Sequence, residues 1–289
     1  MKILVVGGAG YIGAHVVRAL LERGNEVHVI DDLSAGDVRS IPDAQFRRNR
    51  WQTAVVAVEY EGVVLLAGRV LTGESFDDPL GYYDANVAGL IACLDQLVGR
   101  TQRIVFASSC AASNPLSPYA ASKAMGESIL SDAAARHGFS ICVLRFFNVV
   151  GGQNEVWLPK RPASHLLRVL ARVALGMEPA VTVNGVDYDT PDGTCVRDYL
   201  HVRDVAQSVC AAVEGDHSGT HDVGAGRGVS VLEAIRAMQE TGNTHIPVQI
   251  GPRRPGDPPS LIASGKQPWR GDIRELCASE LETEARRGL

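Results

Sequence analysis

The sequence predicts an α/β fold with a doubly wound, parallel sheet and a small C-terminal lobe that we expect to bind a ligand. In the first half of the chain, short continuous apolar runs alternate with segments of helical periodicity. Such runs are typical of strands buried on both faces, and strands that alternate with helices imply right-handed crossovers and a parallel sheet. After Asn148 the pattern loosens, and glycines and prolines become frequent.

Two domains are expected from this change of pattern. Residues 1–148 would form the sheet domain, and residues 198–225 would return to it. Residues 149–197 and 226–289 would form the lobe over the carboxyl edge of the sheet, where open α/β sheets bind their ligands. A chain of 289 residues is long enough for one core domain with such a lobe.

The glycine turn after the first apolar run is the strongest local pattern. The run Ile3–Val6 is expected to be a buried strand, and a helix is expected from Ile12 onward. Between them, Gly7, Gly10 and Gly13 are three residues apart. This spacing allows a tight turn, a close approach of the backbone to a pyrophosphate, and close packing of helix on strand. A purely structural glycine turn is the alternative.

An acidic residue ends the next expected strand. Val27–Ile30 is followed by Asp31, which lies 18 residues after Gly13. A carboxylate at this place is expected to bind the ribose hydroxyls of an adenine dinucleotide, and it would repel a 2′-phosphate. The pattern therefore predicts a site for NAD rather than NADP.

The remaining elements follow the same alternation. The other expected strands are Gln45–Arg47, Val63–Leu66, Arg103–Phe106 and Ser140–Leu144. The other expected helices are Leu80–Leu97, Tyr119–Arg136, Val202–Glu214 and an apolar helix that His165 opens. Residues 50–57 are poorly patterned, so a helix there is only weakly indicated.

A tyrosine and a lysine are expected on one face of the helix from Tyr119. Tyr119 and Lys123 are four residues apart, and positions i and i+4 share a helical face. An ammonium beside a phenol lowers the pKa of the phenol, so Tyr119 could exchange a proton with a substrate hydroxyl near neutral pH. Ser109, after the preceding strand, could hydrogen-bond the same substrate oxygen. A surface pair without chemistry is the alternative.

Composition and charge exclude several functions. The net charge of −5 argues against nucleic acid or an anionic membrane as a partner. The six cysteines are far apart without a Cys-x-x-Cys pair, so we expect reduced thiols, a cytoplasmic protein and no metal site. We expect neither a signal peptide nor a membrane span, because the apolar stretches are shorter than the roughly 18 residues a span needs.

Several segments together carry a resemblance to a known family. They are the glycine turn with Tyr11-Ile12-Gly13-Ala14-His15, then Gly73-Glu74-Ser75, Tyr82-Tyr83-Asp84-Ala85-Asn86-Val87, Leu144-Arg145-Phe146-Phe147-Asn148, Asp192–Val202 and Pro252–Asp257. Together with Ser109 and Tyr119-x-x-x-Lys123, they are similar to the extended short-chain dehydrogenase/reductases, and within that family they resemble the UDP-glucose 4-epimerases. The resemblance extends from Met1 to about Ala263, and the segment around Arg197 is its most specific part.

The resemblance implies a Rossmann fold and a role for each segment. The catalytic residues that it implies are Ser109, Tyr119 and Lys123. The implied NAD site is lined by Gly7, Gly10, Tyr11, Ile12, Gly13, Asp31, Asp32, Leu33, Ser34, Leu66, Ala67, Gly68, Asn86, Ser108, Tyr119, Lys123 and Phe147. The implied UDP-sugar site is formed by Ser109, Tyr119, Asn148, His165, Leu166, Thr182, Val183, Asn184, Arg197, Arg254, Asp257 and Leu261.

Physical chemistry supports part of the implied UDP-sugar site. Guanidinium forks bind phosphate oxygens in paired hydrogen bonds, which suits Arg197 and Arg254. A surface ion pair is the alternative for each arginine. His165 could equally be a helix cap or a packed surface histidine.

The implied activity is that of an NAD-dependent isomerase, an epimerase that inverts C4 of a UDP-sugar of the UDP-glucose/UDP-galactose type. Tyr119, as a phenolate, would take the proton of the sugar 4-hydroxyl while the C4 hydride passes to NAD. The 4-keto sugar would then turn and take the hydride back on its other face. The resemblance also implies a homodimer, formed through the helices from Leu80 and Tyr119.

The sequence departs from the family pattern at several positions. Val6 replaces the threonine that usually opens the glycine turn, and Arg50 stands where an acidic residue usually meets the adenine. Val70 stands where a lysine is expected near the phosphates. Only nine residues separate Ser109 from Tyr119, where the family has a longer loop over the sugar. A short loop would widen the site or open it to water, which weakens electrostatic catalysis.

Three alternative functions are left open. A nucleotide-sugar dehydratase needs an acid and a base just after the serine, where Cys110-Ala111 stands, and this argues against it. A net NAD-dependent reductase or dehydrogenase would use the same three catalytic residues but release the cofactor in each turnover. A catalytically weakened protein that only binds nucleotide sugar or NAD is supported by the changes at Arg50 and Val70.

Overall fold

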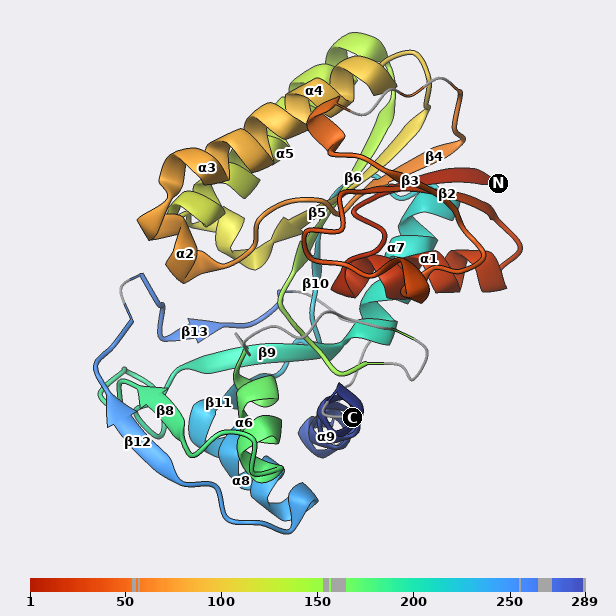
Figure 1. Cartoon of the computed structure of the whole chain (residues 1–289). Coiled ribbons are helices and arrows are strands. Elements are labelled where there is room, and N and C mark those ends of the chain that lie inside the picture. Colours follow the sequence, from red (N-terminus) through yellow and green to blue (C-terminus); the bar gives the residue numbers. More distant parts are fainter. Residues whose placement is uncertain are drawn as a thin grey trace. The chain divides into compact units, whose positions relative to one another are not determined.

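The chain folds into two compact units (Figure 1). The computed structural model describes residues 1–53, 56, 58–152, 156, 165–254, 256–264 and 272–287. The first unit holds Met1–Phe146 and Val205–His221. The second unit holds the described residues from Phe147 to Asp204, apart from Val156, and those from Asp222 onward.

A large sheet of seven strands forms the centre of the first unit, in the order β10-β6-β5-β4-β1-β2-β3. Its strands are β1 (Lys2–Val6), β2 (Glu26–Asp31), β3 (Gln45–Arg48), β4 (Gly62–Leu65), β5 (Arg103–Ser109), β6 (Ser140–Phe146) and β10 (Gly219–Val223). The pairs among β1 to β6 are parallel. The order 3-2-1-4-5-6 is that of a Rossmann fold, so the predicted fold class is confirmed.

Helices cover both faces of this sheet (Figure 1). One face carries α1 (Tyr11–Glu22) and α7 (Val202–Glu214), and the other carries α3 (Pro79–Tyr83), α4 (Gly89–Leu97) and α5 (Pro118–His137). The short helix α2 (Thr72–Asp77) precedes α3, and the π-helical segment η3 (Asp84–Ala88) joins α3 to α4. The apolar core between the sheet and α3 to α5 includes Leu65, Leu90, Phe106 and Leu130.

The predicted elements of the first unit are confirmed, with ends that shift by at most three residues. The predicted helix Leu80–Leu97 is interrupted by η3, and α2 was not predicted. Within 50–57, the described residues form only the 3₁₀ turn η2 (Trp51–Thr53), and residues 54, 55 and 57 lie outside the described part.

The helix α5 begins and ends at clear sequence signals. Ser117 is its N-cap and accepts a hydrogen bond from the Ala120 amide at 3.2 Å, and Pro118 occupies the first helical position. The helix ends at Gly138, which has a left-handed conformation with φ of 78°. These signals place Tyr119 in the first turn of the helix and Lys123 in the second.

The described residues of the second unit form two small sheets and three helices. One sheet has the order β11-β9-β13 with β7 also paired to β9, and β12 pairs with β8. The strands are β7 (Asn148–Val150), β8 (Val181–Asn184), β9 (Val196–His201), β11 (Gly228–Ser230), β12 (Val248–Gly251) and β13 (Ser260–Leu261). The helices are α6 (Leu166–Ala174), α8 (Val231–Gly242) and α9 (Ile273–Arg287), which pack on one another around Leu167, Leu170, Met238 and Leu276.

The helix expected at His165 is therefore present as α6, whereas α9 was not predicted. Among the described residues, no helix is long and apolar enough to cross a membrane.

Candidate active site

The glycine turn between β1 and α1 leaves no room for side chains. Gly7 has a φ of 85°, and a Cβ on it would lie 2.6 Å from the Ala67 amide nitrogen. A Cβ on Gly13 would lie only 2.1 Å from the Gly7 carbonyl oxygen. Gly10 is the N-cap of α1 and has no side chain to cap the first amides, with Tyr11 and Ile12 next in the first turn. A turn of this kind presents backbone N–H groups and the positive end of the helix dipole to an anion.

Asp31, at the end of β2, is buried beside this turn. Its Oδ2 accepts a hydrogen bond from the Ala9 amide at 3.0 Å, and its Oδ1 accepts one from the Leu33 amide at 2.8 Å. Burial raises the pKa of Asp31, and hydrogen bonds from the amides of Leu33, Ala9 and Gly10 oppose this shift only in part. A carboxylate has about four lone-pair positions, so some capacity is left for a ribose hydroxyl.

The neighbouring Asp32 is paired with the unusual arginine. Asp32 Oδ1 accepts a hydrogen bond from the Ser34 amide at 2.8 Å, and Arg50 Nε lies 3.9 Å from Asp32 Oδ2. Arg50 is highly exposed. Arg50, which departs from the family pattern, therefore lies next to the predicted adenosine site, because it pairs with Asp32, one of the residues predicted to line that site.

The turn after β4 is fixed by Asn86 in the π-helical segment. The backbone amides of Leu66 and Ala67 donate to the Val6 carbonyl, and Gly68 follows with a φ of 146°. Asn86 Oδ1 accepts from the Arg69 amide at 2.8 Å, and Asn86 Nδ2 donates to the Arg69 carbonyl at 3.0 Å.

Asn86 also links this turn to α5. Asn86 Nδ2 donates to Ser122 Oγ at 2.9 Å, and Ser122 Oγ donates to the Tyr119 carbonyl at 2.7 Å. Asn86, a predicted cofactor residue, thus connects the Arg69 backbone, next to Gly68, to the first turn of the helix that carries the predicted catalytic pair.

Lys123 is buried between α5 and β5. Its Nζ donates to the Ala107 carbonyl at 2.8 Å and lies 5.0 Å from the centre of the Phe106 ring. Burial lowers the pKa of Lys123 to about 8, and the charge of Glu127 opposes this shift. A Cβ on Gly68 would lie 3.8 Å from Nζ, which shows how closely the β4 turn approaches the ammonium.

Tyr119 lies one turn before Lys123, but its pKa is not lowered as the sequence predicted. Burial raises the pKa of Tyr119 to about 12, and a side-chain hydrogen bond with Ser109 lowers it in part. The prediction of a lowered pKa is wrong for the protein alone, because the buried ammonium of Lys123 donates to a backbone carbonyl and desolvation of the phenol outweighs the remaining effects. Ser109 Oγ also accepts from the Ala111 amide at 3.3 Å.

A group around Tyr82 was not singled out from the sequence. The edge of the Tyr82 ring contacts the Tyr119 ring, with 6.5 Å between centres. The Arg69 guanidinium stacks on the Tyr82 ring at 4.4 Å and pairs with Glu74 and Asp78. Glu74 and Tyr82 lie in two of the segments that carry the family resemblance, and these segments are the signal that could have located the group, whereas Arg69 and Asp78 lie outside them.

The connection between Ser109 and Tyr119 is as short as the sequence indicates. It consists of the 3₁₀ turn η4 (Cys110–Ser113) followed by an exposed stretch over 114–116. Ser108, next to Ser109, donates from Oγ to Glu127 Oε1 at 2.5 Å.

The residues predicted for the UDP-sugar lie mainly on β7, β8, β9 and β13 of the second unit. Asn148 Nδ2 on β7 donates to the Asp198 carbonyl at 3.1 Å. Arg197 on β9 faces Leu261 on β13 in the strand register. Phe147, just before β7, donates its amide to the Val223 carbonyl.

The two arginines predicted to bind the diphosphate have different surroundings. Arg197 is largely buried, pairs with Asp257, and donates to the carbonyls of Val196 and Pro258 at 2.7 and 2.8 Å. Arg254 is exposed. With the Asn184 amide turned so that its oxygen faces Arg254, that oxygen accepts from Nε at 3.1 Å and from Nη2 at 3.2 Å. Thr182 and Val183 precede Asn184 on β8.

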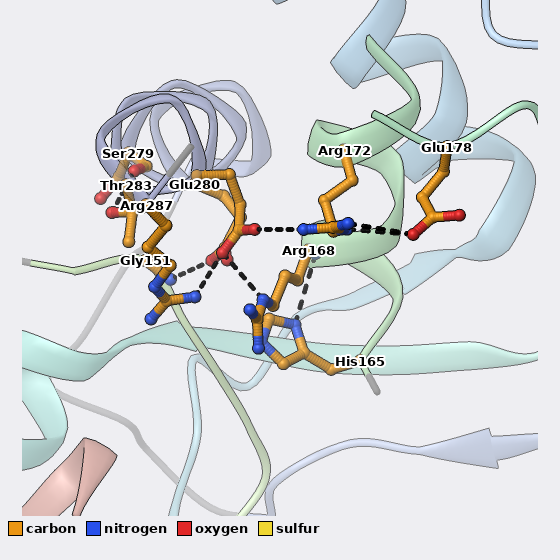
Figure 2. A network of polar contacts seen from close by, with 10 residues as sticks. Gly151, His165, Arg168, Arg172, Glu178, Ser279, Glu280, Thr283 and Arg287 are labelled. Carbon is orange, nitrogen blue, oxygen red and sulfur yellow. Dashed lines mark hydrogen bonds and ion pairs between the residues drawn. The ribbon is translucent and has the colours of Figure 1, made fainter. Parts of the chain in front are cut away.

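His165 caps the helix α6 (Figure 2). Its Nδ1 accepts from the Arg168 amide at 3.4 Å, which is the helix-cap alternative considered above, and Leu166 is the first helical residue. Burial lowers the pKa of His165. Arg168 Nε donates to Oε1 of the buried Glu284 of α9 at 2.8 Å.

A metal centre has no basis in the described ranges, where no group of three His, Cys, Asp or Glu side chains is arranged to hold an ion.

Known proteins show the same organisation. A UDP-glucose 4-epimerase of Azospirillum brasilense is 36% identical over 299 residues, which covers 91% of this chain and 83% of that protein. One of Halalkalibacterium halodurans is 35% identical, with coverages of 92% and 88%. Among solved structures, one is the crystal structure of UDP-glucose 4-epimerase from Bifidobacterium longum in complex with NAD⁺ and UDP. Its sequence is 29% identical to this chain, and the two structures superpose over the full length of both chains with a TM-score of 0.90.

The family profile that matches residues 3–224 spans β1 to the end of the large sheet, including the glycine turn, Asp31, Tyr119 and Lys123. This chain belongs to the NAD dependent epimerase/dehydratase family.

Proposed function

We propose that this protein is an NAD-dependent epimerase that inverts C4 of a UDP-sugar of the UDP-glucose type through a 4-keto intermediate. The observation that carries this proposal is the arrangement of Ser109, Tyr119 and Lys123 at the carboxyl end of β5. It lies in a unit whose glycine turn and Asp31 fit a dinucleotide. The relatives named UDP-glucose 4-epimerase support the reaction, and the relative from Bifidobacterium longum was crystallised with NAD⁺ and UDP.

The first unit would hold the cofactor. A Cβ on Gly7 or Gly13 would collide with neighbouring backbone atoms, and the tight turn that these glycines allow would present the N-terminus of α1 to a pyrophosphate. Asp31 has lone-pair capacity left for the ribose. Lys123 lies beside Gly68 and would contact the nicotinamide ribose. When bound, NAD accepts the hydride of the sugar C4 and returns it.

The protein would move the proton of the sugar 4-hydroxyl through Tyr119. The hydrogen bond with Ser109 favours the phenolate, whereas burial favours the neutral phenol. Ser109 and Tyr119 together would bind the 4-oxygen and hold it in the position for proton exchange. No net oxidation results, because the hydride that leaves C4 returns to it.

The second unit would hold the nucleotide. Arg254 is exposed and has donors for phosphate oxygens, and Asn184 beside it fixes its side chain. Arg197 forms an ion pair with Asp257, which lies three residues after Arg254, and Leu261 is paired with Arg197 in the register of β13 and β9. We leave the substituent at C2 of the sugar open, because Leu261 offers only apolar contact.

The decisive experiment is the conversion of UDP-glucose to UDP-galactose by the purified protein without added reductant, followed by NMR. We expect Tyr119→Phe to lower kcat by a factor of about 10² to 10⁴ while NAD and UDP affinities stay within about twofold. The matched control is Tyr60→Phe, because burial also raises the pKa of Tyr60, which instead hydrogen-bonds His28 away from the carboxyl end of β5. Stoichiometric consumption of NAD would instead select a net dehydrogenase, and binding without conversion would select a binding protein.

We further propose a homodimer formed through the helices that begin at Leu80 and Tyr119. Apolar side chains on the outer face of α3, α4 and α5 support it, since Leu80 is 79% exposed and Ile91 and Met125 are each 45% exposed. Light scattering should give twice the chain mass for the native protein and the chain mass for Ile91→Glu. A monomeric native protein would contradict the proposal. A cytoplasmic location is likewise a proposal, based on the scattered cysteines.

A further inference from the structure

The helix that carries Tyr119 and Lys123 holds the end of β5 at two consecutive turns. Lys123 Nζ binds the Ala107 carbonyl at 2.8 Å. One turn further along α5, Glu127 Oε1 accepts a hydrogen bond from Ser108 Oγ at 2.5 Å. Two consecutive residues of β5 are therefore fixed by side chains four residues apart on α5.

The same carboxylate also binds the next strand. Arg145 on β6 donates to Glu127 Oε1 from Nε at 2.9 Å and to Oε2 from Nη2 at 2.6 Å, which is a two-pronged, charge-assisted contact. Ser108 and Arg145 are direct partners in the parallel register of β5 and β6. Glu127 therefore connects α5 to two neighbouring strands at one level of the sheet.

The position of this contact is well shielded from water. The Glu127 side chain is 14% exposed, and Ser108 and Lys123 are buried. Hydrogen bonds to charged groups are worth more in such surroundings than at the surface. The negative charge of Glu127 also opposes the effect of burial on the pKa of Lys123.

We propose that Glu127 is a positioning residue for the C4 chemistry: by binding Ser108 and Arg145 together, it fixes the register of α5 against β5 and thereby the places of Tyr119 and Lys123. The inference rests on the proposed function. It adds to that function a residue that touches neither substrate nor cofactor and acts through the catalytic pair.

Two variants separate the effect of the charge of Glu127 from the effect of its side-chain length. Glu127→Gln keeps the length but removes the charge and sets an amide against Arg145. We expect kcat to fall about tenfold or more, with KM for UDP-glucose within about twofold. Glu127→Asp keeps the charge but is one methylene too short to bind both partners, so kcat should fall as well.

The pH profile distinguishes positioning from a general loss of stability. The charged group that acts on Lys123 is Glu127, on the same helix. Tyr119 lies one turn before Lys123, Cys110 after β5 acts on Tyr119, and Arg145 on β6 binds Glu127. Lys123 must stay protonated, so activity should fall as pH rises through its pKa. Without the charge of Glu127 that pKa decreases, so the alkaline limb should move to lower pH in Glu127→Gln and stay in place in Glu127→Asp.

A measurement without turnover keeps this test independent of the proposed function. NAD affinity of the cofactor-free protein, followed by tryptophan fluorescence, should fall at least fivefold in Glu127→Gln, because Lys123 is displaced. The control is Asp216→Asn, which removes the exposed ion pair with Arg103 at the opposite end of β5 and should change nothing. If native protein binds NAD but does not epimerise UDP-glucose, the proposed function fails while the NAD titration still decides the inference.

The inference is overturned if Glu127→Gln retains native kcat, pH profile and NAD affinity. It is also overturned if the alkaline limb moves equally in both Glu127 variants. Should Glu127→Gln not fold, Glu127→Asp decides alone, and native kcat together with native NAD affinity in that variant would refute the positioning role.

Discussion

At the scale of single residues, Asp31 does two things with one carboxylate. It accepts hydrogen bonds from the amides of Ala9 and Leu33, which holds the glycine turn against the end of β2. Leu33 has a positive φ of 61°, a conformation that L-residues adopt rarely and that this hydrogen bond helps to maintain. In the proposed cofactor site, the same carboxylate would repel a 2′-phosphate.

Replacing Asp31 should therefore weaken the discrimination between NAD and NADP. We expect Asp31→Ala to lower the ratio of NAD affinity to NADP affinity about tenfold or more, because the repulsion of the 2′-phosphate is lost. Titration of both cofactors by fluorescence measures the ratio. Asp31→Asn is the control for the backbone contacts, because its amide oxygen can still accept one of the two amide hydrogens. An unchanged ratio in Asp31→Ala would contradict the proposed place of the ribose.

The residue scale also shows what spacing can and cannot predict. The interval between Tyr119 and Lys123 predicts a shared helical face, and the same interval leads on to Glu127, so the contact with Ser108 could have been sought from the sequence. The direction of the Tyr119 pKa could not be predicted. The pKa of Tyr119 depends on its burial and on which acceptor Lys123 hydrogen-bonds, and both are set by tertiary packing.

At the scale of elements, α9 is anchored by charges rather than by an apolar stripe alone. Glu284 is fully buried and binds Arg168 and Arg172 of α6 and Arg287 of its own helix. Glu280, one turn earlier, accepts the Gly151 amide at 2.6 Å. The last helix thus fixes both the end of β7 and the start of α6.

Removing the charge of Glu284 should destabilise the protein markedly. We expect Glu284→Gln to lower the free energy of unfolding by about 3 kcal/mol at pH 7, because buried arginines lose their partner. Urea unfolding measures the change. Glu282→Gln on the same helix is the control, since Glu282 is exposed and its ion pair with Arg286 is worth at most about 0.5 kcal/mol.

The same variant should show a defined pH dependence. Burial raises the pKa of Glu284, but the charges of Arg287 and Arg168 outweigh it, and the net shift is downward. A lowered pKa means that the stabilisation is present above the unfolded value of about 4.3 and is lost as pH falls through the folded value. The difference between native protein and Glu284→Gln should therefore shrink below about pH 4, and a constant difference down to pH 2 would contradict this assignment.

Elements that the sequence did not predict lack the usual periodic signal for a physical reason. In α9 two of the positions that face inward are Glu280 and Glu284, so hydropathy places them on the solvent side. In α2 the one large apolar residue, Phe76, is exposed. In contrast, β1 and β4 are apolar at nearly every position because both of their faces are covered, so these strands can be predicted from the sequence.

At the scale of the whole molecule, the proposed ligand contacts divide between the two units. The glycine turn, Asp31 and Lys123 belong to the first unit, and Arg197 and Arg254 belong to the second. Each unit has its own core of buried apolar residues. Binding of one ligand should therefore stabilise one unit more than the other.

Hydrogen exchange should resolve this division. We expect saturating NAD to slow amide exchange mainly in Met1–Phe146, and UDP to slow it mainly in β8 and β9. Mass spectrometry of peptic peptides from the native protein reports both. Protection by UDP confined to the glycine turn would contradict the proposed nucleotide residues. Because UDP carries no sugar, the protection that it gives reports contacts of the nucleotide alone.

The π-helical segment Asp84–Ala88 has a consequence for helical phase. Buried residues recur every four positions at Tyr82, Asn86, Leu90 and Leu94. In a regular α-helix this spacing drifts by about 40° per step, so the inward side would rotate out of contact along its length. The wider turn at η3 takes up part of that rotation, which lets a single rod direct Asn86 at the β4 turn and Leu90 and Leu94 at the sheet. The wider π-helical turn thus allows the hydrogen bonds of Asn86 and the apolar packing of Leu90 and Leu94 to lie on the same side of the helix.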